Sequence, residues 1–341
     1  MNTSFPHNSP NFRTWDWQKV IARYENPDLW RSIWQLVNTI IPYFGIWYLM
    51  YRSLEVSYWV TLALSVVAAG FVMRIFIIFH DCGHGSFFRS QRANDFWGWI
   101  TGILTFTPYY FWRNSHARHH ATSGDLDRRG AGDIWTMTVE EYQRSSGWKK
   151  FAYRFSRHPV GLLLIGPAFF FLIRNRVTLG ALGPRERFSV HLTNLLLLNI
   201  ILWMSCAIGF RNYMMVQLPI TMLAASAGVW LFYVQHQFEG VYWERHADWN
   251  YVQEAMEGSS YYKLPIILQW FSGNIGFHHI HHLSPRIPNY HLQRCYNADP
   301  IFRKIKPITF ISSLKSLAFH LWDEKRRRLI AFRDLGKLVR A

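Results

Sequence analysis

The chain has 341 residues, of which 50% are hydrophobic, 18% aromatic and 17% charged, and its formal net charge is +16. This composition excludes a disordered or fibrous protein and leaves ample apolar material for a buried core or for membrane spans. The three cysteines, Cys82, Cys206 and Cys295, have no paired spacing. They therefore exclude a disulfide framework and a thiolate zinc site, and they indicate a reducing, cytoplasm-facing compartment.

The first part of the chain is expected to form a polar N-terminal segment followed by a helical hairpin. Segment 1–30 has no basic start followed by an apolar run, so we expect a cytoplasmic N-terminal segment without a cleavable signal peptide. Ile33–Met50 and Tyr58–Phe79 are each close to the 20 or so helical residues that a bilayer requires, and only a few residues separate them. The motif HDCGH follows directly and contains His80 and His84.

The next apolar run, Phe96–Trp112, contains Pro108 and is predicted to be an interfacial or half-buried helix. The motif HARHH follows it. Spacings of three and four residues place side chains on one face of a helix, so His116, His119 and His120 can point toward a common centre.

The second half of the chain contains the other apolar runs. Val160–Ile173 is short and broken by Gly and Pro, which predicts a second interfacial helix. Phe188–Phe210 and Tyr213–Gln235 form a second close pair of expected spans, and His236 follows the last of them. A large soluble helical core is disfavoured, because it could not hide four such long apolar runs.

The third histidine motif, HHIHH, contains His278, His281 and His282 and lies beyond the last expected span. We divide the chain into segment 1–30, a membrane domain 31–310 with a cytoplasmic cap, and a basic cytoplasmic tail 311–341. The sequence thus predicts an all-α integral membrane protein with four transmembrane helices in two hairpins, interfacial helices, and a helical cap that holds the histidines.

The distribution of basic residues predicts the orientation. Arg52 and Arg211 lie in the outer turns and Arg74 lies within a span, which leaves 34 of the 37 Lys and Arg on the other face. By the positive-inside rule that face is cytoplasmic, together with both termini and all histidine motifs. Topology and anionic lipid head groups account for the net charge. No nucleic-acid-binding motif is present, so we expect membrane lipids and no nucleic acid as partners.

Nine histidines on one face indicate metal binding, because neutral imidazole is the commonest metal-ligating side chain and suits iron, zinc, copper and nickel. Nine ligands exceed the capacity of one ion, which predicts two ions with four or five nitrogens each. The absence of H-E-x-x-H and E-x-x-H excludes the usual zinc-protease and carboxylate di-iron signatures and favours a histidine-rich di-iron site. The nine expected ligands are His80, His84, His116, His119, His120, His236, His278, His281 and His282.

The three motifs and the hairpins around them, over roughly residues 30–310, resemble the integral-membrane fatty acid desaturases. This resemblance implies two iron ions, O2 as co-substrate, and the removal of two hydrogens from an acyl chain to create a cis double bond. It also implies that His236 is the ligand outside the motifs. His279 is an extra histidine that faces elsewhere on a helix, and we leave it out.

Two further features resemble the acyl-lipid members of this family. Three residues separate His80 from His84, and the sequence LSPRIPNY (283–290) follows the third motif. The resemblance implies a lipid-linked substrate and an omega-6 (delta-12-like) activity, while the substrate-binding residues stay unknown.

Several polar residues beside the motifs are candidates to orient the ligands, since a ligating imidazole usually donates its other N–H to a carboxylate, carbonyl or water. Each could equally be an exposed charge or a helix cap. The candidates are Asp81, Asp125 and Asn274, with Asp127, Asp133 and Glu239 also nearby.

The chemistry requires two electrons, but the chain has no flavin or dinucleotide fingerprint, and three cysteines cannot hold an iron–sulfur cluster that needs four. The donor is therefore expected to be a separate protein, a ferredoxin or a b-type cytochrome, attracted to the basic face. Alternative functions are a di-iron membrane hydroxylase and a carotenoid ketolase or hydroxylase. A metal transporter is disfavoured, because the spans contain almost no ionisable residues.

Overall fold

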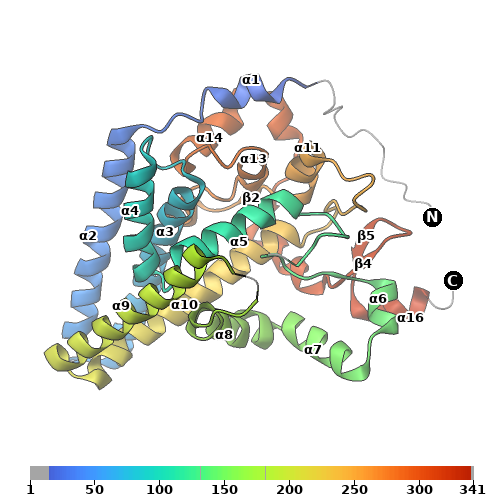
Figure 1. Ribbon diagram of the computed structural model, residues 1–341. Coiled ribbons are helices and arrows are strands. Elements are labelled where there is room, and N and C mark those ends of the chain that lie inside the picture. The colour runs from blue at the N-terminus through green and yellow to red at the C-terminus, as the bar shows by residue number, and fades with distance from the viewer. Residues whose placement is uncertain (1–14, 131, 181, 339–341) are drawn as a thin grey trace.

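The computed structural model describes residues 15–130, 132–180 and 182–338, and most of them are helical (Figure 1). Four long helices form one part of the molecule, and a cap of short helices and strands lies over one of its ends. The long helices are α2 (Leu29–Ser53), α3 (Tyr58–His84), α9 (Pro184–Ile208) and α10 (Phe210–His236).

The long helices form two adjacent pairs with short links, as the apolar runs predict. Four residues, 54–57, join α2 to α3, and Gly209 alone joins α9 to α10. Gly209 has a φ of 86°, a conformation that glycine adopts without a steric penalty. The third expected span therefore ends at Ile208, and Phe210 begins the next helix.

Length and composition support three spans, or four if one bent pair of helices counts as a span, where the sequence predicts four. Among the described residues, α3, α9 and α10 are long and apolar enough to cross a membrane, and α2 is not among them. Polar residues such as Gln35, Asn38 and Thr39 interrupt the apolar surface of α2. A further candidate is a pair of segments, 147–157 and 161–176, that together are apolar enough but bend by 74°.

The two runs expected to be interfacial helices are more broken than predicted. Phe96–Trp112 divides into α4 (Gln91–Leu104) and α5 (Tyr109–Thr122). The turn between them contains Phe106, with a φ of 56°, and ends at Pro108, which cannot continue a helix ladder. The run Val160–Ile173 contains a π-helix, η2 (Gly161–Ile165), followed by α8 (Gly166–Leu172).

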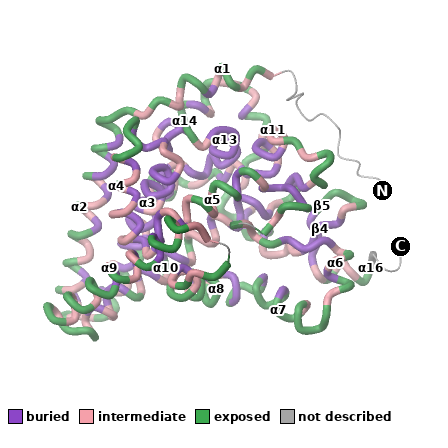
Figure 2. Tube along the Cα trace, viewed as in Figure 1, coloured by how far each residue is buried: buried purple, intermediate pink, exposed green. Residues whose placement is uncertain are grey.

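Helix α3 is the centre of the molecule. It is apolar on all sides, and such a helix is stable only when other elements surround it. Figure 2 shows α3 and α13 largely buried, whereas α9 and α7 are mostly exposed. Its one cation, Arg74, donates to Thr39 Oγ1 at 3.1 Å and to the Trp270 carbonyl, so the charge is held by protein contacts.

The molecule is mostly helical, as predicted, but the cap also contains short strands, which corrects the prediction of a wholly helical cap. Strand β1 pairs in parallel with β4, which pairs antiparallel with β5, and β2 pairs in parallel with β3. Leu321 and Trp322 of β4 are almost completely buried, so residues 321–330 pack against the cap. Apolar residues alternate too briefly in these short strands for the sequence to reveal them. The strands are β1 (Met137–Thr138), β2 (Tyr262–Lys263), β3 (Ile308–Thr309), β4 (Leu321–Asp323) and β5 (Arg328–Ile330).

Short helices complete the cap and its edges. Most of them begin or end at a polar or proline residue, and α6 has a full capping box between Thr138 and Glu141. These elements are α1 (Trp17–Ala22), α6 (Val139–Arg144), α7 (Gly147–Arg157), η3 (Arg174–Arg176), α11 (Tyr251–Gln253), η4 (Glu254–Gly258), α12 (Ile266–Phe271), α13 (His278–Leu283), α14 (Asn289–Ala298), η5 (Pro300–Lys304), α15 (Phe310–Ser313), η6 (Leu314–Ala318), η7 (Phe332–Asp334) and α16 (Leu335–Leu338).

Candidate metal centre

The first two histidines lie in the last turns of α3. The helix stops at Gly85, whose φ of 71° is left-handed, and the N–H of Ser86 donates to the Asp81 carbonyl. Glycine is the usual residue at this position, because it has no β-carbon to clash. His80 and His84 are thereby fixed one turn apart at the end of a rigid helix.

Helix α5 contains the second motif and contributes histidines in two directions. His116 and His120 are four residues apart and share one face, while His119 points toward a different neighbour. Trp112, one turn earlier, stacks on the His116 ring at a centroid distance of 4.3 Å. One short helix therefore contributes to two neighbouring sites.

The remaining histidines come from α10 and α13. His236 is the last residue of α10, and α13 begins at His278 after the tight turn at Gly273 and Asn274, both with positive φ. His278, His281 and His282 are each at most 2% exposed. Four helices thus bring their histidines to one buried place.

The nine predicted histidines form two groups in the structure. In each group one ring nitrogen per histidine lies within 4.8 Å of all the others. Two ligands on opposite sides of an ion with bonds of about 2.1 Å are about 4.2 Å apart, so these separations are close to what one ion requires. The group of five is His80, His84, His116, His120 and His281, and the group of four is His119, His236, His278 and His282.

The chemistry of these nitrogens fits a metal. His281 Nε2 lies 3.0 Å from His120 Nε2, and His278 Nε2 lies 3.0 Å from His236 Nε2. Burial, with the neighbouring histidines, holds the pKa of His120, His281 and His282 well below the ordinary 6.5, which keeps these rings neutral. A metal ligand must be a neutral imidazole with a free lone pair.

Several buried nitrogens also have no partner within the described protein. The Nε2 atoms of His84, His119 and His282 are buried and have no hydrogen bond. An unpaired buried polar atom costs roughly 1–3 kcal/mol, so its presence calls for a ligand. Three such atoms in one cluster support two metal sites rather than a chance gathering of rings.

Carboxylates orient some of the rings from behind. Asp133 lies 2.6 Å from His119 Nδ1, Asp81 lies 3.1 Å from His80 Nδ1, and Glu254 lies 3.3 Å from His282 Nδ1. When Nδ1–H donates to a carboxylate, the Nε2 lone pair is left facing the group, and the ring becomes more basic. Both groups therefore have at least one histidine in a fixed tautomer.

Comparisons with known proteins decide the family. The sequence model described as "Fatty acid desaturase" matches residues 57–309. A fatty acid desaturase of Bacillus subtilis (strain 168) is 49% identical over 317 residues, which are 93% of this chain and 90% of the relative. The chain belongs to the fatty acid desaturase family. This desaturase is an oxidoreductase, and its apolar helices make it an integral membrane protein.

Two more distant relatives have more specific names. The sn-1 oleoyl-lipid 12-desaturase of Synechocystis is 25% identical over 279 residues, 79% of this chain and 75% of that protein. The sn-2 acyl-lipid omega-3 desaturase (ferredoxin) of Helianthus annuus is 26% identical over 340 residues, 92% of this chain and 68% of that protein. The similarity to both extends over most of the desaturase chain.

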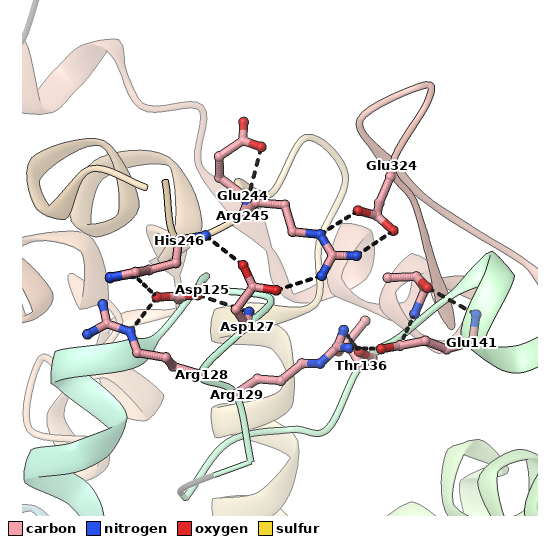
Figure 3. Close-up of polar contacts among 11 residues, drawn as sticks. Asp125, Asp127, Arg128, Arg129, Thr136, Glu141, Glu244, Arg245, His246 and Glu324 are labelled. Carbon is pink, nitrogen blue, oxygen red and sulfur yellow. Dashed lines mark hydrogen bonds and ion pairs between the residues drawn. The ribbon is translucent and has the colours of Figure 1, made fainter. Parts of the chain in front are cut away.

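Two of the candidates for orienting ligands contact none of the nine histidines. Asp125 accepts from Arg128 Nε at 2.6 Å and lies 2.8 Å from His246 Nδ1, within a polar network at the edge of the cap (Figure 3). The Asn274 side chain accepts from Gln269 at 3.0 Å. His279, which we left out, lies among aromatic rings such as Tyr261.

Glu254 is the residue that sequence reasoning missed. It is fully buried in η4, and burial raises its pKa to about 7. Nothing in the sequence marks it out from Glu257, because neither glutamate has a histidine motif beside it. Only the π-helical turn, which brings Glu254 next to α13, reveals its role.

A cavity of about 760 Å³ extends from the histidines into the long helices. His80, His116 and His278 lie in its wall, so it is continuous with both groups. Along α10 the lining residues recur at helical spacing from Gln235 down to Gln217, a length of about 27 Å.

Polar contacts involve the lining residues furthest from His236 along α10. Trp47 Nε1 donates to Gln217 Oε1 at 3.0 Å, and Gln217 Nε2 donates to Thr221 Oγ1 at 3.1 Å. Tyr213 is buried one turn below. The remaining walls are mainly aliphatic and aromatic, so the cavity is largely apolar.

Proposed function

We propose that this desaturase introduces a cis double bond into the acyl chain of a membrane lipid at a centre of two iron ions, with O2 as co-substrate. The group of five histidines would hold one ion and the group of four the other. The observation that supports this proposal is the long apolar cavity whose wall includes histidines of both groups. A hydrocarbon chain is the ligand that such a cavity fits.

The protein's own part in the reaction follows from the contacts. When bound, the two irons would supply the oxidising chemistry that removes two hydrogens from the chain. The cavity walls hold the acyl chain extended and exclude water from the reacting carbons. Asp133 and Glu254 keep His119 and His282 in the ligating tautomer.

The position of the double bond has two candidates. Omega-6 (delta-12-like) activity is supported by the sequence after the third motif and by the Synechocystis relative, which is named a 12-desaturase. The cavity favours a second candidate, a bond nearer the carboxyl end. Six methyl-side carbons need only about 8 Å, from bonds of about 1.5 Å in an extended chain, whereas the lining follows α10 for about 27 Å.

The proposed topology is four spans in two hairpins, α2–α3 and α9–α10, with the histidines, the cap and both termini in the cytoplasm. The excess of Lys and Arg outside the outer turns supports this orientation. The division into 1–30, 31–310 and 311–341 is proposed on the same basis.

A separate electron donor completes the proposal, either a ferredoxin or a b-type cytochrome. The Helianthus relative is named as ferredoxin-dependent. Several basic residues of this face already have acidic partners: Arg128 pairs with Asp125, Arg129 with Glu141, and Arg327 with Glu244. Internal ion pairs weaken the field of these residues, so other cations of this face would contribute most of the attraction.

The experiment is expression in a host that lacks desaturases, followed by localisation of double bonds in its lipids. A new cis bond in lipid-linked chains supports the proposal, and its position separates the two candidates. An added hydroxyl group would instead identify a hydroxylase, and oxidised carotenoids in a carotenoid-producing host would identify a ketolase or hydroxylase. Metal accumulation without lipid change would indicate a transporter.

A further inference from the structure

The cavity wall has an imbalance of charge that the acyl chain does not explain. Apart from histidines, its charged lining residues are Arg118, Arg174 and Asp133. Asp133 is already engaged, because His119 Nδ1 lies 2.6 Å from one of its oxygens and the Gly130 N–H donates to the other at 3.0 Å. Two guanidinium groups therefore line the cavity without a free carboxylate.

Neither arginine has an acidic partner among the described residues. No ion pair involves Arg118, which is exposed on α5. Arg174, the partly buried first residue of η3, has its guanidinium 5.2 Å from the Phe111 ring centroid and, among the described residues, donates only to the Val177 carbonyl. An arginine that lines a cavity and has no carboxylate beside it is available to bind an anion.

The two arginines flank one face of α5. Phe111, Ser115 and Arg118 follow a spacing of four and three residues, so they share a stripe, and all three line the cavity. Arg174 lies over Phe111 at one end of this stripe, and Arg118 is two turns away, about 10.5 Å along the helix. Along the axis of α5, His116 lies between the two cations, about 7.5 Å from Phe111 and about 3 Å from Arg118, so both cations lie beside this histidine on the cavity wall.

We propose that Arg118 and Arg174 form a binding site for the phosphate of the substrate's head group at the mouth of the acyl cavity. The inference rests on the proposed function, because it requires an acyl chain in the cavity. Guanidinium groups hold phosphate oxygens through paired, charge-assisted hydrogen bonds. A phospholipid is the source that lies in the same membrane, and an acyl-CoA thioester offers the same phosphate chemistry from solution.

The test measures binding rather than turnover. Iron-loaded desaturase in neutral detergent micelles is titrated with labelled dipalmitoyl phosphatidylglycerol, dipalmitoylglycerol or palmitoyl-CoA. Arg118→Gln and Arg174→Gln are each expected to weaken phosphatidylglycerol binding about tenfold, since each removes a charge-assisted contact. Dipalmitoylglycerol, which has the chains but no phosphate, should bind the variants and the unaltered protein equally.

Two controls separate this site from general surface charge and from misfolding. Arg92→Gln removes an exposed arginine of α4 that lies outside the cavity and forms no ion pair with the described residues, and it should leave the binding of all three ligands unchanged. Arg118→Lys keeps a cation and should restore part of the lost binding. The inference would be overturned if Arg92→Gln weakened phosphatidylglycerol binding equally, or if the two cavity variants weakened dipalmitoylglycerol binding as much as phosphatidylglycerol binding.

The remaining outcomes assign the source and keep the two proposals apart. If palmitoyl-CoA binds more tightly than the phospholipid and depends on the same arginines, the phosphate site stands and its ligand comes from solution. Phosphate-selective binding by a protein that forms no double bond in the deficient host contradicts the proposed function alone. Double-bond formation without any preference for phosphate contradicts the head-group site alone.

Discussion

Two regions of this desaturase contain a histidine paired with an aspartate, and they differ in almost everything else. In the metal centre, His119 lies 2.6 Å from Asp133, and both side chains are at most 5% exposed. In the polar network at the edge of the cap, His246 lies 2.8 Å from Asp125, but the His246 side chain is 56% exposed (Figure 3). The pair alone therefore does not identify a metal site.

The surroundings of the second ring nitrogen make the difference. His119 Nε2 is buried without a partner and lies among His236, His278 and His282. In the polar network, the carboxylates form ion pairs with guanidinium groups: Arg128 pairs with Asp125, and Arg245 pairs with Asp127. A carboxylate that faces arginines stabilises the surface, whereas one that faces an imidazole and no arginine orients a ligand.

The largest expected effect comes from removing a ligand. His120→Ala and His236→Ala should each abolish desaturation and lower the iron content of the purified protein, because each removes a nitrogen from one of the two groups. Iron analysis and product analysis measure both effects. His191→Ala, on the exposed side of α9, is the control and should retain both iron and activity. Normal turnover in His120→Ala would falsify the ligand assignment.

The sequence predicts the regular parts of this molecule better than its contacts. Helical spacing within the three motifs, and the position of His236 at the end of an apolar run, were enough to predict nine histidines that the structure brings together. The family prediction is confirmed by the comparisons. Both depend on local periodicity, which a single sequence records directly.

Contacts between segments that are distant in the chain could not be predicted from the sequence. Asp125 lies next to the second motif in the chain but turns toward Arg128 and His246, while Glu254 lies far from every motif and reaches His282. The short strands of the cap depend on partners up to about two hundred residues away in the chain, as Met137 and Leu321 show. Such pairs depend on tertiary packing rather than on the residues that are neighbours in the sequence.

A second prediction compares the two aspartates directly. Asp133→Asn should weaken iron binding about 10–100-fold, because His119 loses the acceptor that fixes its tautomer. Asp125→Asn should leave iron binding unchanged, since Asp125 contacts none of the nine histidines. Iron retention during titration with a chelator measures both variants. Equal losses in the two would show that the centre and the network are not separate.

A third prediction concerns pH and the iron-free protein. In the folded state the pKa values of His116, His120, His278, His281 and His282 are all held below 6.5 by burial and by neighbouring histidines. The unfolded chain therefore binds more protons than the folded chain below pH 6.5, and stability present above that pH is lost as the pH falls.

Glu254 opposes this trend, because its pKa is raised to about 7 from 4.5 and its contribution is lost as the pH rises between those values. Because five imidazoles lose stability as the pH falls and one carboxyl group gains it, the net free energy of unfolding should decrease at lower pH. The thermal unfolding midpoint of the iron-free protein should thus fall by several degrees, roughly 5 °C, from pH 7 to pH 5.5. A midpoint that rises toward acid would contradict the neutral state of these rings.

The smallest effect is expected in the polar network. Arg245 donates to both oxygens of Glu324, at 2.8 and 3.0 Å, and also pairs with Asp127, which ties the β4–β5 hairpin to the segment after α5. The Arg245 and Glu324 side chains are 46% and 32% exposed, so water and salt screen their attraction. Arg245→Gln should lower the unfolding midpoint by less than about 3 °C and leave iron content unchanged, and 0.5 M salt should remove most of the difference. Loss of iron in Arg245→Gln would mean that the network supports the centre through Asp125, and the distinction between the two histidine–aspartate pairs would fail.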